Sequence, residues 1–282
     1  MNRWSWALLI VASCQLFTDD VVQCSTNADC ESRGGEFAGS VCKDRVCAGP
    51  TSCRGSVVWE AEDPSRPLHA HILFVDFSLK PVAGAKAVVC AQLDANCDRP
   101  SAPYVTGPDG YALIELPRAF RGQIRVKEPP PDFDETFLQA AVINLPPIVA
   151  DENESTVVPS YAAVRLLSRA QLDLLLAFIG KKTEPGKGHI LGAVYDCNYR
   201  PLRDATLKAS PPDPNTLFFL GDANDTLAPG QATTSGSALF AFLNVPPGVT
   251  SLEASYQNQR WSSVQVLTNP DVITTLVLPP SP

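Results

Sequence analysis

The chain is poor in the residues that most often carry catalysis. Three of its 282 residues are histidine and one is methionine. No G-x-S-x-G nucleophile elbow, H-E-x-x-H zinc motif or glycine-rich phosphate loop occurs in it. A serine–histidine–aspartate triad needs no sequence motif, but three histidines leave few ways to build one. We therefore expect a protein that is not an enzyme and that needs no cofactor.

Charge is also sparse, and basic residues are outnumbered. Charged residues make up 18% of the chain, with 22 Lys and Arg against 30 Asp and Glu and a formal net charge of −8. Such a chain does not bind nucleic acid or anionic lipid through general electrostatics. By contrast, 26 prolines and 17 glycines are present, which favours short strands joined by turns. The composition predicts a mainly β protein with no nucleic-acid partner.

The apolar stretch near the N-terminus, Trp6–Ala12, follows Arg3 and ends just before Cys14. It is too short to span a bilayer and has the length of a signal-peptide core. Val11-Ala12-Ser13-Cys14 resembles a bacterial lipobox. In proteins with this motif the signal is cut before the cysteine, whose thiol then carries a diacylglyceryl group. The resemblance implies a signal peptide over residues 1–13, a lipid anchor at Cys14 and a tether over residues 14–23.

The residue after the predicted lipid site is Gln15 rather than aspartate. By resemblance to enterobacterial sorting signals, this implies an exported protein held at the outer membrane or cell surface. The alternative is an ordinary secreted protein that is cut near Cys14 for other reasons.

Cysteine is plentiful, with nine residues in the chain. If Cys14 carries lipid, an even number remains, which suits oxidation to disulfides in an exported protein. Five of the eight crowd into residues 24–53, a segment too small to bury a sufficient core without covalent bridges. A zinc site is the competing hypothesis, but the spacings contain no C-x-x-C and no nearby histidine. The disulfide candidates are Cys24, Cys30, Cys42, Cys47, Cys53, Cys90, Cys97 and Cys197.

The segment 24–53 resembles small Cys-rich modules that follow the lipobox in myxobacterial surface lipoproteins. That resemblance implies the pairs Cys24–Cys42 and Cys30–Cys47. Cys90 and Cys97 would close a turn. Cys53 and Cys197 are then left over, and a bridge between them would join the module to the C-terminal part of the chain.

A strand–turn–strand pattern occurs twice, about 120 residues apart. In each copy an apolar strand ends at aspartate, Asp76 or Asp196, and a turn follows at Pro81 or Pro201. Each copy continues with further turns and strands, marked by Asp109-Gly110 in the first copy.

This pattern resembles the carboxypeptidase regulatory-like domain, a prealbumin-type β-sandwich without catalytic residues, although the turn glycine expected before each proline is missing. The implied fold class is mainly β, with two prealbumin-like β-sandwiches, a short connecting helix and an N-terminal disulfide-rich module. The predicted boundaries are 24–53 for the module, 67–148 for the first sandwich, 149–186 for a strand–helix connector and 187–282 for the second sandwich.

The connector contains a helix signal. Ser168 and Gln171 form a capping box, six apolar residues follow, and Gly180 suits the position after the helix. A strand is predicted just before, over residues 163–167. We expect the broad apolar surface of this helix to be buried between the two sandwiches.

Two clusters have the residue types of metal sites. His69 and His71 alternate on a predicted strand and so face one side, with Asp76 as a third candidate ligand. The alternative is that they are polar residues at a strand edge. Asp94, Asn96 and Asp98 alternate as at the start of a calcium loop, and a weaker cluster lies at Asp222–Asp225. Both calcium candidates can equally be solvated turns.

The sequence therefore predicts a non-enzymatic cell-envelope lipoprotein that acts as a surface binding or structural module. Its partners would be the membrane, through the lipid, and a protein or glycan at the cell surface, with Tyr104, Tyr111 and Trp261 as candidate glycan contacts or, alternatively, packing residues. An accessory subunit of an envelope complex that pairs through edge strands is the main alternative, and a metal-dependent hydrolase is the next.

Overall fold

The computed structural model describes residues 23–34, 37, 39–76, 78–128, 139–143, 155–157, 163–211, 217–220, 227–228, 233–234 and 238–282. The chain divides into two compact units, Met1–Gly49 and Pro50–Pro282. The predicted class is confirmed, because the described residues form many strands, two helices and a disulfide-rich N-terminal region. The N-terminal unit ends at Gly49, four residues before Cys53, where the predicted module ends.

The N-terminal unit is a small structure held by two disulfides. Helix α1 (Asn27–Glu31) begins with a capping box between Thr26 and Asp29. Strands β1 (Val41–Lys43) and β2 (Val46–Ala48) form an antiparallel hairpin. Its disulfides are the pairs that the module resemblance implied, namely Cys24–Cys42 and Cys30–Cys47.

The first sandwich is built from two sheets. One has the order β10–β3–β6, with β9 also paired to β3, and the other places β8, β7, β4 and β5 side by side. Alternate residues of β3 point into the core, where the fully buried Phe74 and Ile114 are among the largest side chains. The strands are β3 (Asp63–Val75), β4 (Lys86–Cys90), β5 (Tyr104–Val105), β6 (Tyr111–Arg118), β7 (Gln123–Glu128), β8 (Gln139–Ile143), β9 (Ser155–Val157) and β10 (Val164–Arg165).

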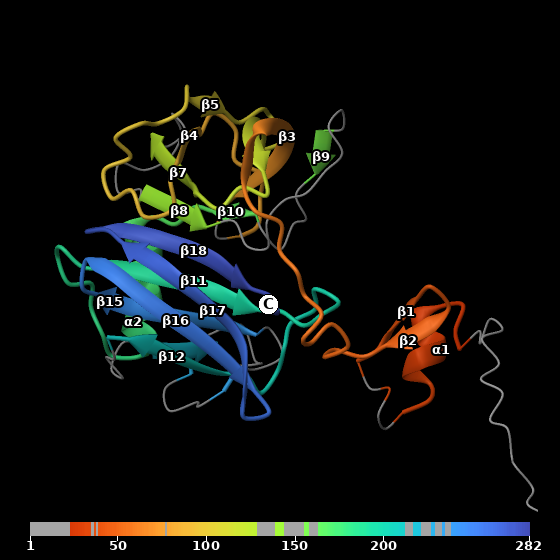
Figure 1. Cartoon of the computed structure of the whole chain (residues 1–282). Coiled ribbons are helices and arrows are strands. Elements are labelled where there is room, and N and C mark those ends of the chain that lie inside the picture. Colours follow the sequence, from red (N-terminus) through yellow and green to blue (C-terminus); the bar gives the residue numbers. More distant parts are fainter. Residues whose placement is uncertain are drawn as a thin grey trace, which may run out of the picture. The chain divides into compact units, whose positions relative to one another are not determined.

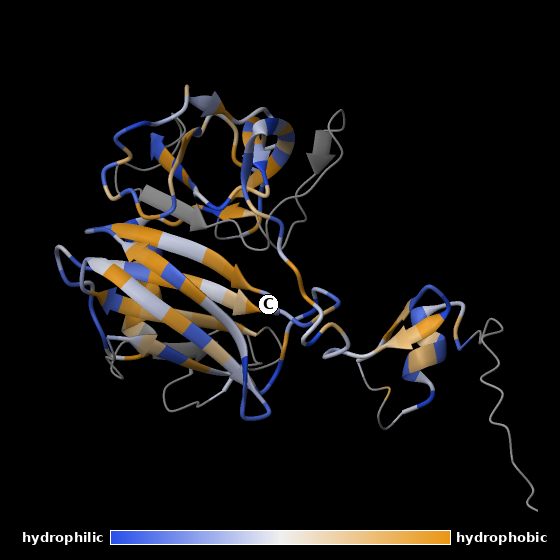
Figure 2. Ribbon diagram, in the orientation of Figure 1, coloured by the Kyte–Doolittle hydropathy of each residue, from blue (hydrophilic) through white to orange (hydrophobic). Residues whose placement is uncertain are grey.

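The second sandwich repeats this arrangement. One sheet holds β14, β13, β15, β11 and β18, and the other has the order β12–β16–β17. Hydrophobic and hydrophilic residues alternate along β16 and β17 (Figure 2), as expected for strands with one face on a core. The strands are β11 (Gly188–Val194), β12 (Thr206–Ser210), β13 (Leu217–Leu220), β14 (Leu227–Ala228), β15 (Leu239–Val245), β16 (Gly248–Tyr256), β17 (Gln259–Thr268) and β18 (Val272–Leu278).

The two sandwiches share a sheet. Strand β18 pairs in parallel with β11 of its own sandwich and with β8 of the first sandwich, so one nine-stranded sheet runs through both. Figure 1 shows β18 lying between these two strands. Because backbone hydrogen bonds cross the junction, the sandwiches are joined along a strand rather than by a linker alone.

Helix α2 (Arg169–Phe178) has the predicted capping box at Ser168 and Gln171, and Gly180 follows it with φ +68°. Its position differs from the expectation. The buried Leu172 and Leu176 pack against β15 and β18 on the outer face of the second sandwich, and not between the two sandwiches. The predicted strand before the helix is β10, which pairs with β3 and so completes the first sandwich.

The predicted strand–turn–strand repeat has the same hydrogen bonds at the aspartate turn in both sandwiches. The Asp76 carboxylate accepts from the amides of Ser78 and Lys80 at 2.8 and 2.9 Å. The Asp196 carboxylate accepts from Asn198 and Arg200 at 2.7 and 2.9 Å. The positions of the missing turn glycines are taken by Leu79 and Tyr199, whose φ angles are +63° and +56°. The fold therefore keeps a left-handed residue at this turn even without glycine.

A threonine ties the next turn in each copy. The hydroxyl of Thr106 donates to the carbonyl of Val82 at 2.7 Å and accepts from the amide of Ala85 at 2.9 Å. Thr234 makes the same two bonds, at 2.6 Å and 3.0 Å, in the second sandwich. These buried bonds explain why both copies keep threonine where other turn residues vary.

Candidate functional site

The two candidate metal histidines lie on the outer face of β3. His69 and His71 alternate with the buried residues Ala70 and Ile72, so both point away from the core. Antiparallel pairing of β3 with β6 places Glu115 directly opposite His69. The His69 Nε2 and Glu115 Oε2 atoms are 3.8 Å apart, and both side chains are more than half exposed.

Asp76 is not part of this group. Its carboxylate faces the turn, where it accepts from two backbone amides, so its oxygens stabilise the repeat turn. Within the described ranges, one group of three or more metal-type ligand atoms lies within mutual reach, and it consists of Cys24, Cys30 and Cys47. These sulfurs are held in disulfides, which removes the thiolates that zinc requires.

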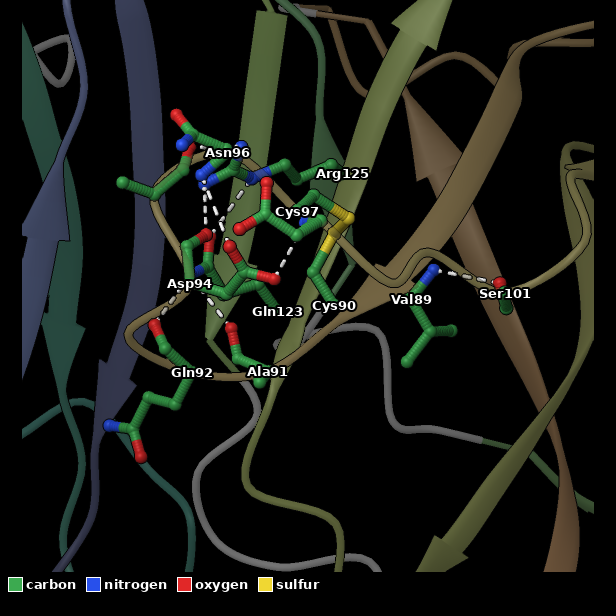
Figure 3. Close-up of a disulfide and its surroundings, with 12 residues drawn as sticks. Val89, Cys90, Ala91, Gln92, Asp94, Asn96, Cys97, Ser101, Gln123 and Arg125 are labelled. Carbon is green, nitrogen blue, oxygen red and sulfur yellow. Dashed lines mark hydrogen bonds between the residues drawn. A yellow bond between two sulfur atoms is a disulfide. The ribbon is translucent and has the colours of Figure 1, made fainter.

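The calcium-like loop at Asp94 is organised by an arginine. The guanidinium of Arg125 (β7) donates to the carbonyl oxygens of Asp94 and Ala95 at 3.0 and 2.8 Å (Figure 3). The Asp94 carboxylate accepts from the amides of Asn96 and Asp98 at 3.2 and 2.8 Å. Loop oxygens of the kind that calcium would use are thus directed at an internal cation or at the loop's own backbone.

Arg125 is buried, and its hydrogen bonds hold the loop in place. Arg125 is 9% exposed, and desolvation lowers its pKa, opposed by the nearby charge of Asp94. The disulfide Cys90–Cys97 closes the loop beneath it. Gln92, at the loop surface, donates to the carbonyl of Gln265 on β17 at 3.1 Å, which connects this loop to the second sandwich. The loop thus contacts the second sandwich through this hydrogen bond.

The third histidine, His189, occupies the position in the second sandwich that His69 occupies in the first, but it is buried whereas His69 is exposed. His189 on β11 is 2% exposed, and its Nδ1 accepts from the amide of Asn244 at 3.2 Å. Burial, assisted by the charge of Arg169, lowers its pKa to about 4, and the carboxylates of Asp271 and Asp173 oppose the shift. His189 is therefore a neutral packing residue beneath α2 and not an exposed strand-edge residue.

The candidate aromatic contacts are mostly packing residues. Trp261 is 2% exposed, lies in the core of the second sandwich and donates from Nε1 to the carbonyl of Tyr195 at 2.8 Å. Tyr104 packs against the first core, and its hydroxyl donates to the carbonyl of Glu115 at 3.4 Å. Tyr111 is half-buried on β6. Trp261 is thus sealed off from any glycan.

The start of the second unit, Pro50–Glu62, is bound along both sandwiches. A disulfide joins Cys53 to Cys197 in the second sandwich, and the Arg54 guanidinium lies 5.9 Å from the centre of the Trp261 ring. Further on, Glu60 pairs with Arg118 of the first sandwich at 2.8 Å. This pair is bidentate and the Arg118 side chain is 14% exposed, so it holds the segment to the first sandwich while the disulfide holds it to the second.

Some predicted sites lie outside the described residues, namely the lipid site Cys14 and the acidic cluster Asp222–Asp225. Of the part of the chain that the structure describes, no helix has the length and apolar character needed to cross a membrane. The residues missed from the sequence are Glu115 and Arg125. The hairpin register of β3 and β6 points to Glu115, whereas nothing in the sequence of β7, which also holds Lys127 and Glu128, singles out Arg125.

Neither the known protein families nor the curated proteins contain a match to this chain. Among solved structures, the D295N mutant of the shaft pilin SpaA from Lactobacillus rhamnosus GG is 12% identical, with 77% of this chain and 99% of the pilin covered and a TM-score of 0.25. The minor pilin GBS52 from Streptococcus agalactiae is 11% identical, with 76% and 97% covered and a TM-score of 0.23.

The Bacillus anthracis TIE protein is 10% identical with a TM-score of 0.23, and the match covers 76% of this chain but only 34% of that protein. At identities of 10–12% and TM-scores of 0.23–0.25, these likenesses indicate no shared function.

Proposed function

We propose that this chain is an exported bacterial lipoprotein, anchored through Cys14, whose fused sandwiches form a non-enzymatic display or structural module at the outer membrane. Cysteine pairing is the observation that carries the proposal. Eight of the nine cysteines are joined in four disulfides. Cys14 is the one cysteine left, and it stands where the lipobox-like motif requires a free thiol.

The disulfides also support export. Three of the four bridges involve buried sulfurs, and one, Cys53–Cys197, links segments 144 residues apart. Such bridges persist in oxidising compartments and are rare in the cytosol. Gln15 after the predicted lipid site favours the outer membrane over retention at the inner one.

The architecture suits a display role. Any pull that reaches the second unit from the N-terminal anchor arrives at Cys53, where the chain is covalently joined to the second sandwich. The parallel pairing of β8 and β18 then connects both sandwiches in one sheet. A pair of sandwiches joined in this way presents its loops in a constant arrangement, as a spacer or recognition platform requires.

Metabolic labelling with a palmitate analogue tests the anchor. Wild-type chain should incorporate label and sediment with outer-membrane vesicles, whereas the Cys14→Ala variant should carry no label and leave the membrane fraction. Gln15→Asp is the matched variant for sorting, because it keeps the lipid site and should move the labelled protein to the inner membrane. Equal labelling of wild type and Cys14→Ala would overturn the proposal.

A further inference from the structure

The outer face of the β3–β6 sheet carries metal-binding side chains that neither the fold nor the proposed function uses. His69 and Glu115 are 55% and 60% exposed, and their atoms approach to 3.8 Å. Even a fully charged pair with this exposure contributes less than about 1 kcal/mol to stability. Stability therefore does not explain why these residue types gather here.

The internal repeat shows what the fold itself needs at these positions. The residues of the second sandwich that correspond to His71 and Glu115 are Leu191 and Leu243, which pack against α2. There the face is apolar because a helix covers it. In the described part of the first sandwich no helix lies on this face, and His69, His71, Leu113 and Glu115 on it are exposed or half-buried. The repeat explains a histidine at position 69, matched by His189, but not the histidine at 71 or the glutamate at 115.

The geometry suits chelation. His69 and His71 are two residues apart on one strand, and Glu115 is the direct cross-strand neighbour of His69. Metal–ligand bonds of about 2.0–2.2 Å place two tetrahedral ligands roughly 3.3–3.6 Å apart, close to the 3.8 Å between His69 Nε2 and Glu115 Oε2. The His71 imidazole does not lie within the same reach of both partners in the structure, so its side chain has to rotate to complete the site.

We propose that His69, His71 and Glu115 form a surface site for a borderline divalent ion, Zn²⁺ or Cu²⁺. Two imidazoles and one carboxylate match the preference of these ions for nitrogen with some oxygen. Three protein ligands leave one coordination position for water or for a group on another molecule. The site replaces the ligand set with Asp76 that the sequence suggested, and it does not depend on the lipid anchor.

A competition titration of the full chain in detergent, without reductant, tests the site. Zn²⁺ and Cu²⁺ are titrated separately against a chromophoric chelator, and we expect one ion per chain. His69→Ala and His71→Gln should each weaken binding by about tenfold or more, and Glu115→Gln should weaken it less, because imidazole is the stronger ligand. Glu128→Gln is the matched control, since it removes another exposed, paired carboxylate of the same sandwich and should leave binding unchanged.

Electron paramagnetic resonance of the Cu²⁺ form distinguishes this site from incidental surface binding. We expect hyperfine coupling to two imidazole nitrogens, reduced to one in either histidine variant. Full binding in the His69→Ala/His71→Gln double variant, or no binding of either ion at 100-fold excess over the chain, would overturn the proposal. Melting curves of the variants should coincide with wild type, because these side chains lie outside the core.

Discussion

The buried histidine beneath α2 makes the stability of the second sandwich dependent on pH. His189 is 2% exposed, and its pKa falls from 6.5 to about 4 on folding. The unfolded chain therefore binds a proton between pH 6.5 and pH 4 that the folded chain does not. Stability conferred by the neutral ring is complete above pH 6.5 and is lost as pH falls toward 4.

The magnitude follows from the shift. A difference of about 2.5 pKa units corresponds to about 3 kcal/mol across the whole window. Protonation of Nδ1 also removes the acceptor for the Asn244 amide. His189→Asn should abolish this part of the pH dependence, because its side-chain oxygen keeps an acceptor near the Nδ1 position and does not titrate in this range.

Two assays measure the pKa of His189 and its contribution to the pH dependence of stability. The imidazole resonances of His189 should titrate with a midpoint near pH 4 in the folded protein. Urea unfolding of wild type should lose stability between pH 6.5 and pH 4, and the His189→Asn variant should lose about 3 kcal/mol less over that range. A resonance midpoint near 6.5, or equal pH dependence in both proteins, would refute the assignment of His189 as a buried neutral residue.

Three further substitutions test the local structure. Leu79→Gly should raise the free energy of unfolding by about 0.5–1 kcal/mol, because an exposed leucine at φ +63° is strained; an unchanged or lower value in urea denaturation would contradict this. Arg125→Met should cost about 2–4 kcal/mol by leaving the carbonyls of Asp94 and Ala95 without their donor, and a calcium-restored melting temperature would revive the calcium hypothesis. Ser168→Ala should cost about 1 kcal/mol by removing the cap of α2, measured by the same denaturation, while no change would mean that the cap is dispensable.

Local chemistry was predictable from the sequence. The capping box at Ser168 and the glycine after the helix depend on residues three or a few positions apart, and they appear in α2 as expected. The repeat turns were equally visible, because an aspartate that accepts from the next backbone amides needs only its own loop. The positive φ of Leu79 could not be predicted, since leucine has no preference for the left-handed region.

Contacts between distant segments were not predictable in the same way. The pairing of β8 with β18 joins strands more than 100 residues apart, and strand edges carry no signal for a specific partner. The apolar residues of helix α2 predict that it is buried, but they do not predict which sheet it packs against. The partner of His69 emerged only from the register of β3 and β6, which replaced Asp76 by Glu115.

The most direct test of the account is the intact mass of the native protein extracted from membranes, followed by peptide mapping without reduction. The proposed lipoprotein begins at Cys14, carries at least the added mass of a diacylglyceryl group and contains four disulfides, including Cys53–Cys197. A chain that retains residues 1–13, or one with an unmodified Cys14, would contradict the proposed lipoprotein.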